Sequence, residues 1–164
     1  MNCDNCGGPA SILTGQTHHY TECGLDNVYL SNLKTLACES DSCKSIEPII
    51  PRLKLVHETI AEAVALQPYA LIGAEARFLR KQCRLKAREW AALLRVDVST
   101  LSRWENGEQS IGSQSDALIR HLYFRLLEQG GHARPGPIAE RIAAATQPRN
   151  ELSSVLIDAG NPAI

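Results

Sequence analysis

Five of the six cysteines lie within the first 43 residues, and their spacing could hold a metal ion. Two residues separate Cys3 from Cys6, a spacing that places two thiolates on one tight turn. Cys38 and Cys43 form a second, more widely spaced pair further along. Zn²⁺ prefers four soft ligands at the corners of a tetrahedron, and two such turns at the ends of short strands supply them. We therefore predict one structural zinc ion per chain, bound by these four cysteines.

The remaining thiols and imidazoles leave alternatives for this site. Cys23 could replace Cys38 or Cys43, and His18 and His19 are weaker candidates. Free or redox-active thiols, or iron in a rubredoxin-like site, would also use clustered cysteines, although a reducing cytosol disfavours disulfides. Cys83 stands apart on the apolar side of a predicted helix, where we expect a small core residue.

Four cysteines make a closed site, whereas a catalytic zinc keeps one position open and recruits a nearby base. The sequence contains no His–Glu pair at metal-ligand spacing, no nucleophile elbow and no phosphate-binding loop. A zinc or thiol enzyme is the competing class, and we expect a protein that is not an enzyme.

A second constellation, within residues 76–107, is typical of a helix-turn-helix. Trp90, Leu93 and Leu94 give the first helix a buried stripe, and a three-residue turn follows. Asp97 is a suitable N-cap for the second helix, 98–106, and Gly107 is suited to end it. We predict that this second helix reads DNA in the major groove.

The two sides of that helix differ in chemistry. Val98 and Leu101 are expected to point inward, with Trp104 or Glu105 completing that side. Small hydroxyl side chains on the outer side allow close approach to DNA, and an arginine there can hold guanine O6 and N7 with two hydrogen bonds. The outer side carries Ser99, Thr100, Arg103 and Asn106.

This segment resembles the Xre/Cro-type helix-turn-helix in eight positions of one register: Val96, Thr100, Ser102, Arg103, Trp104, Glu105, Asn106 and Gly107. Ala87 stands where the pattern has a phosphate-contacting glutamine, and Arg84 and Arg95 replace its turn glycines. Two cationic side chains near the phosphate backbone would offset the strain of left-handed arginines. We expect base contacts from Ser99, Thr100 and Arg103, and phosphate contacts from Arg80, Lys81, Lys86, Arg88, Arg95, Ser102 and Asn106.

The elements that must position these groups divide the chain into four parts and predict an α+β protein. Residues 1–50 read as a small β-rich zinc module, with short strands at 20–22 and from 28–30 through 36–37. An extended connector with two prolines precedes a linker helix at 52–66, within a linker at 51–72. An Xre/Cro-like domain at 73–129 has helices near 74–83, 87–94, 98–106 and 114–128, which with the linker helix make an all-α, five-helix unit. The tail, 130–164, is expected to be loose, with one possible short helix at 138–145.

Charge is distributed unevenly along the chain. Residues 1–72 carry four Lys/Arg against eight Asp/Glu, and residues 73–128 carry ten against seven, whereas the whole chain has a net charge of −1. The middle segment can therefore contact DNA phosphates, and the acidic N-terminal part suits binding of a protein or a metal.

No apolar run approaches the ~20 residues that span a bilayer, and the first residues do not form a signal peptide, so we expect a cytoplasmic protein.

The order of these parts resembles the MqsA (YgiT-type) antitoxin family over residues 1–128. Three strings carry the resemblance: residues 1–7, MNCDNCG; residues 20–28, YTECGLDNV; and residues 77–81, RFLRK. It implies a homodimer formed through the C-terminal domain, a palindromic operator in the protein's own promoter, and a ribonuclease toxin held by the zinc module. By matching position it also places base contacts on Ser99 and Arg103. The chain departs from the family in its wider second cysteine pair and in Ser99, which replaces an asparagine.

Two functional hypotheses follow. The first is a zinc-containing transcriptional repressor that is the autoregulating antitoxin of a type II toxin–antitoxin pair. The second is a stand-alone regulator of the same build, associated with a prophage or with anti-CRISPR genes, which has no toxin partner. An adjacent gene for a small basic ribonuclease would favour the first.

Overall fold

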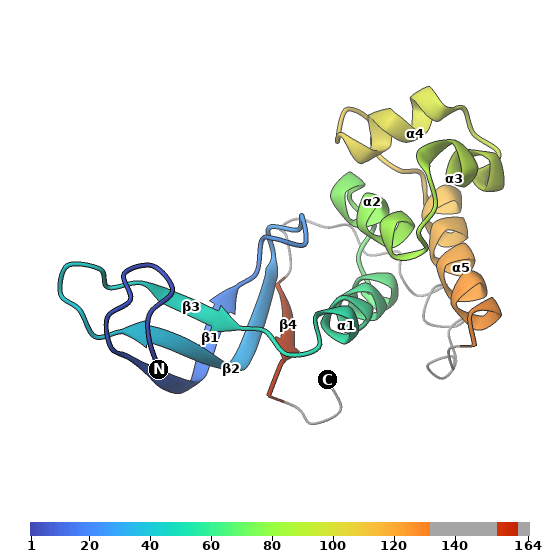
Figure 1. Ribbon diagram of the computed structural model, residues 1–164. Helices are drawn as coiled ribbons and strands as arrows, with labels where there is room; N and C mark the ends of the chain where they lie inside the picture. Colours follow the sequence, from blue (N-terminus) through green and yellow to red (C-terminus); the bar gives the residue numbers. More distant parts are fainter. Residues whose placement is uncertain (132–153, 161–164) are drawn as a thin grey trace.

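The computed structural model describes residues 1–131 and 154–160 and shows an α+β protein (Figure 1). A sheet with the N-terminus at its far end leads into a group of helices. The strands are β1 (Ala10–His19), β2 (Val28–Cys38), β3 (Ile46–Ile49) and β4 (Val155–Asp158). The helices are α1 (Leu53–Leu66), α2 (Gly73–Gln82), α3 (Ala87–Leu94), α4 (Val98–Glu105) and α5 (Ser113–Gln129).

Strand β2 is the centre of the sheet. It pairs with β1 in antiparallel fashion along nearly its whole length, with register irregularities around Gly15. Its other edge is shared: β3 pairs antiparallel with Lys34–Ala37, and β4 pairs parallel with Val28–Ser31. One end of β2 therefore runs toward the cysteines, and the other end lies beside β4.

The first strand differs from the prediction. A strand was expected at 20–22, but these residues lie in a turn, in which the Gly24 N–H donates to the Thr21 carbonyl at 2.9 Å. The strand instead occupies Ala10–His19, where most side chains on both faces are exposed. Because neither face of this strand is continuously buried, its sequence lacks the apolar–polar alternation that reveals a strand.

The end of the chain also corrects the prediction of a loose tail. Residues Val155–Asp158 form β4, with Val155 and Ile157 buried and the intervening Leu156 exposed. The Val155 N–H donates to the Asn27 carbonyl at 2.7 Å, which starts the parallel ladder. The short helix expected at 138–145 lies outside the described residues.

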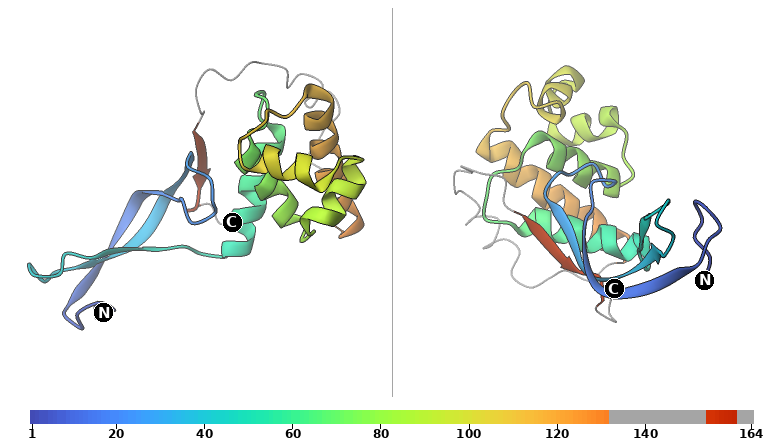
Figure 2. Two further views of the ribbon diagram at one scale, coloured as in Figure 1. Left: turned by 90° about the horizontal axis from the view of Figure 1, so that it is seen from above. Right: turned by 90° about the vertical axis from the view of Figure 1, so that its left-hand side faces the viewer.

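Helix α1 lies between the sheet and the other helices (Figures 1 and 2). Its apolar stripe recurs at Val56, Ile60 and Val64, and each of these side chains is fully buried. One continuous core joins β2, β4 and α1 to the helices that follow. The sheet and the helices are thus packed together through α1 rather than tethered by a free linker.

A buried arginine fixes the end of α1. The Arg120 guanidinium of α5 is fully buried and pairs with Asp116 one turn earlier, with 2.6 Å between Nε and Oδ1. Its other N–H groups donate to the carbonyls of Ala65 and Gln67 at the end of α1 and of Tyr69 just beyond it. Breaking this buried network would uncouple α1 from α5.

The predicted helices are confirmed. The predictions for 52–66, 74–83, 87–94, 98–106 and 114–128 agree with α1 to α5 to within one residue at each end. Their boundaries follow local chemistry: the Glu89 carboxylate accepts from the Lys86 N–H at 2.7 Å at the start of α3, and Gly107, with φ +75°, follows α4.

Candidate metal centre and DNA-reading surface

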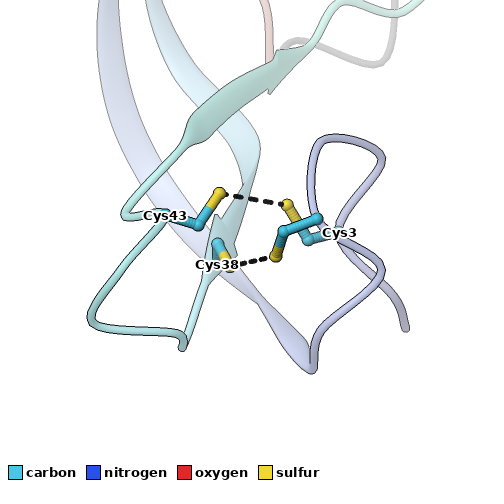
Figure 3. A group of neighbouring side chains, drawn as sticks. Cys3, Cys38 and Cys43 are labelled. Carbon is cyan, nitrogen blue, oxygen red and sulfur yellow. Dashed lines mark hydrogen bonds between the residues drawn. The ribbon is translucent and has the colours of Figure 1, made fainter.

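The two predicted cysteine pairs meet at the end of the sheet that lies farthest from the helices (Figures 1 and 3). The sulfurs of Cys3, Cys6, Cys38 and Cys43 all lie within 4.8 Å of one another. Cys3 Sγ lies 3.8 Å from Cys43 Sγ, and Cys6 Sγ lies 3.5 Å from Cys38 Sγ. A tetrahedral ion bound by thiolates at ~2.3 Å separates neighbouring sulfurs by about 3.8 Å, so the arrangement of the four sulfurs is compatible with such an ion.

Each cysteine pair lies on a tight turn. The Gly7 N–H donates to the Cys3 carbonyl at 2.8 Å, and the Gly8 N–H donates to Cys6 Sγ at 3.4 Å. In the second turn, the Cys43 N–H donates to the Ser40 carbonyl at 3.1 Å. The longer spacing of the second pair therefore does not prevent its cysteines from converging with the first pair.

Polar neighbours tune the thiols. The Ser45 hydroxyl lies 3.1 Å from Cys3 Sγ and lowers the pKa of that thiol. Ser45, through its side chain and its backbone, also lowers the pKa of Cys43 to about 6. A hydrogen bond from the Ser40 backbone lowers the pKa of Cys38, but burial and hydrogen bonds with the other thiols outweigh it and raise that pKa to about 12. Binding of a metal cation would displace the protons of these thiols, because thiolates are the ligands.

The alternative ligands lie elsewhere. Cys23 Sγ donates to the Tyr20 carbonyl at 3.3 Å and is not part of the sulfur cluster. His18 lies 3.5 Å from the Glu22 carboxylate, and His19 contacts the Asp26 carbonyl while its ring stacks on Tyr29. Cys83 packs against the core, and burial raises its pKa to about 11, as expected of a core residue.

The helix-turn-helix is formed by α3 and α4. Leu101, Trp104 and Glu105 are buried on the inner side of α4, as predicted. Val98 was expected to point inward, yet it is 45% exposed, because it opens the helix beside the exposed turn. Leu93 was placed in the buried stripe of α3 and is also exposed, since Trp90 and Leu94 occupy the inner positions. Asp97 precedes α4 as predicted, but its side chain makes no capping hydrogen bond.

The outer side of α4 presents polar groups. Ser99, Ser102, Arg103 and Asn106 are exposed, and Thr100 is half-buried. Arg84 and Arg95 have φ values of 56° and 57°, the left-handed conformation predicted for the positions where the Xre/Cro pattern has glycine. The exposed side chains expected to contact phosphate are Lys81, Lys86, Arg88, Arg95, Ser102 and Asn106.

An ion-pair clamp holds α4 against α2. The Glu105 carboxylate accepts two hydrogen bonds from Arg80, at 2.6 and 2.8 Å, and Arg77 Nε lies 3.5 Å from it. Arg80 also donates to the Leu85 carbonyl at 2.9 Å, so its guanidinium faces the protein interior. Arg77 further donates to the Asn106 side-chain oxygen. The clamp therefore supports the end of α4 from inside the fold.

A close backbone contact accompanies this clamp. A Cβ atom at Gly73, the first residue of α2, would lie 1.8 Å from the carbonyl oxygen of Trp104. Only glycine lets the two helices approach so closely. The supporting roles of Gly73, Arg77 and Ser45 were not predicted from the sequence. The arginines three positions apart in α2 and the buried Glu105 were the available signal, but their pairing depends on how the helices cross.

Comparison with known proteins agrees with this geometry. A family model described as a helix-turn-helix domain matches residues 71–122, about a third of the chain, from just before α2 into α5. No curated protein and no solved structure matches the chain. In residues 1–131 and 154–160, no helix combines the length and apolarity needed to cross a membrane. The chain thus carries a helix-turn-helix domain, the fold of DNA-binding regulators, together with four cysteines arranged compatibly with a metal site.

Proposed function

We propose that this protein is a sequence-specific, DNA-binding transcriptional repressor with a structural zinc ion. The observation that carries the proposal is the outer side of α4, where Ser99 and Arg103 are exposed while Leu101, Trp104 and Glu105 fix the helix from within. A short helix that is rigidly held and presents small polar groups with one arginine suits entry into the major groove.

The exposed side chains divide into two roles. Arg103 is proposed to hold a guanine through O6 and N7, with Ser99 and Thr100 contacting neighbouring base edges. Phosphate contacts, which position the protein without reading sequence, are proposed for Lys86, Arg88, Arg95, Ser102 and Asn106. Lys81 was expected among them from sequence, but it lines a cavity with Lys54 of α1, so no DNA contact is proposed for it. Arg80 was grouped with these residues from sequence, and its pairing with Glu105 favours a positioning role for it instead.

Zinc is the proposed ion at the cysteine cluster. Four thiol sulfurs within 4.8 Å of one another suit Zn²⁺, and four cysteine ligands leave no open position for catalysis. Cys3, Cys6, Cys38 and Cys43 would hold the ion, and its chemistry there is that of a cross-link between two turns. This role is structural and agrees with a regulator rather than an enzyme.

The proposed partners extend the resemblance to the MqsA-type antitoxins. A homodimer would place two copies of α4 on a palindromic operator, in the protein's own promoter. The acidic part of the chain, residues 1–72, would hold a basic ribonuclease toxin. In this form the protein is an autoregulating antitoxin.

One observation favours the stand-alone regulator as the second candidate. Strand β4 lies beyond the region that resembles the antitoxins and pairs with β2 in the metal-binding sheet. The chain thus supplies its own strand to an edge that a partner could otherwise occupy. Co-purification from the native operon discriminates the two: a stoichiometric ribonuclease supports the antitoxin, and its absence supports the stand-alone regulator.

The DNA-reading role is tested by footprinting the zinc-loaded protein on its own promoter. Arg103→Ala should weaken operator binding by ~1–3 kcal/mol and relax specificity at one base pair. Arg125→Gln, which removes an exposed cation from α5, is the matched control and should keep full affinity. Full operator affinity of the Arg103→Ala variant would contradict the assignment.

A further inference from the structure

A cavity of about 320 Å³ lies between α1, the end of α2 and α5. None of its lining residues comes from α3 or α4. Figure 1 and the right-hand view of Figure 2 show α1 and α4 on opposite sides of α2, so the cavity lies away from the outer side of α4. Its volume falls at the lower end of the range of small-molecule sites.

Cations surround this cavity. Lys54 comes from α1, Lys81 from the last turn of α2, and Arg84 from the turn that follows. Glu58 is the acidic residue in the lining, and it lies 3.7 Å from the Lys54 ammonium, which balances its charge. Glu62 of α1 lies outside the lining but close enough to act on the Tyr123 hydroxyl. Three cations against these two carboxylates leave a positive surplus of one charge, which favours an anion.

A buried donor supplies a second, independent observation. Tyr123 of α5 lines the cavity although the residue is only 1% exposed, and the described residues form no hydrogen bond to its hydroxyl. In the described part of the chain, several polar side-chain atoms are both unpartnered and closed off from solvent, and the Tyr123 hydroxyl is not one of them. The hydroxyl is therefore accessible from the cavity. Burial raises the pKa of Tyr123, so the phenol stays protonated and can donate. A buried donor without a partner is costly unless a ligand or water satisfies it.

We propose that this cavity binds a small organic phosphate. Residues with donor groups line it from α1, from α2 with its following turn, and from α5. A phosphate offers three terminal oxygens to such donors, whereas a carboxylate offers two, and charge-assisted hydrogen bonds to it are strong. The aromatic ring of Tyr123 and the side chain of Leu127 provide apolar surface for a short organic group. The Tyr123 hydroxyl and Lys54 bind phosphate oxygens, and Arg84 and Lys81 add charge at the rim. This site does not depend on the DNA-reading role of α4.

The test is calorimetric titration of the full-length protein with glycerol phosphate and with inorganic phosphate. Ionic strength is held constant with NaCl, because screening alone changes the binding of anions. We expect saturable binding of one glycerol phosphate per chain. Succinate, a dianion with planar carboxylates, should bind more weakly.

Variants separate a built site from general attraction. Tyr123→Phe removes one hydroxyl from the cavity and should weaken glycerol phosphate binding about tenfold or more, the effect of one hydrogen bond to a charged group. Lys54→Gln should weaken it several-fold and reduce its salt dependence. The controls Arg125→Gln and Tyr29→Phe remove an exposed cation and a hydroxyl that do not line the cavity, and they should leave binding unchanged.

Three results would overturn the proposal. The first is the lack of saturable binding of either phosphate at millimolar concentration. The second is a loss of affinity in Arg125→Gln as large as in Lys54→Gln, or unchanged binding in Tyr123→Phe. The third is succinate binding as tight as that of glycerol phosphate, which would assign the cavity to a different class of anion.

Discussion

The cysteine end of the sheet and the contact between α2 and α4 both have a well-defined geometry, but different interactions stabilise them. At the cysteine end, Cys6 and most of β1 are exposed, and the turns around them have few apolar side chains to bury. Between α2 and α4, a glycine admits close backbone contact and a buried ion pair fixes the crossing. We therefore expect the first region to depend on a bound ion in place of a core, whereas the second is fixed by packing.

Removal of the proposed zinc ion should have the largest effect on stability. That effect should be confined to the cysteine end of the sheet. Zinc binding contributes ~10–16 kcal/mol in small zinc peptides, so chelation should unfold residues 1–9 and 38–45. The helices should persist, because they share the core of α1 and β2 away from the cysteines. Hydrogen exchange measured before and after chelation checks this prediction.

Two cysteine variants refine that prediction. Cys6→Ala should abolish stoichiometric zinc, whereas Cys23→Ala, the matched control, should retain one ion per chain because Cys23 lies outside the cluster. Elemental analysis gives the stoichiometry. Loss of helical protection on chelation would show that the two regions are not independent.

The clamp should give the next largest effect. Glu105→Ala leaves the Arg80 guanidinium without its carboxylate in a nearly buried position, where breaking a pair costs about 3 kcal/mol. Urea unfolding should show this loss, and operator binding should weaken because α4 loses its support. Glu108→Ala, which removes an exposed carboxylate just beyond α4, should change neither. An unchanged urea midpoint for Glu105→Ala would show that the ion pair does not fix the crossing of α2 and α4.

The close approach of α2 and α4 at Gly73 should give the next largest effect on stability. Gly73→Ala would place a methyl group against the Trp104 backbone, where neither partner is a flexible side chain, and overpacking of this kind costs ~1–3 kcal/mol. Gly112→Ala is the control, because a Cβ there meets open space and its φ is −68°. Thermal unfolding should separate the two variants, and equal melting temperatures would mean that α2 and α4 shift apart without cost.

The same comparison explains what the sequence could predict. The helices were found because each carries a local apolar stripe, as Val56, Ile60 and Val64 do in α1. The cysteine cluster was found because ligand types and spacing are themselves the signal of a metal site. In both cases the relevant information lies within a few neighbouring residues or in rare residue types.

The features that were missed depend on partners far away in sequence. Strand β4 is four residues long, and only its pairing with β2 distinguishes it from an ordinary tail. Gly73 and Glu105 resemble ordinary helix residues until the crossing of α2 and α4 brings backbone and charges together. Leu93 and Val98 fit an apolar stripe, and the structure leaves them exposed because no described element covers that side of the turn.

The smallest effect concerns Arg95, in the turn between α3 and α4. Its φ of 57° strains a non-glycine residue, so Arg95→Gly should raise the free energy of unfolding by up to about 1 kcal/mol. Its exposed cation is a proposed phosphate contact, so the same change should weaken operator binding and reduce the salt slope of log K by about one. Arg84→Gly relieves the same backbone strain at φ 56°, but Arg84 lines the cavity between α1 and α5, so its salt slope should stay unchanged. If Arg95→Gly is more stable and keeps the salt slope of log K, Arg95 contributes neither to packing nor to DNA binding. The turn between α3 and α4 is then fixed neither by packing nor by a ligand.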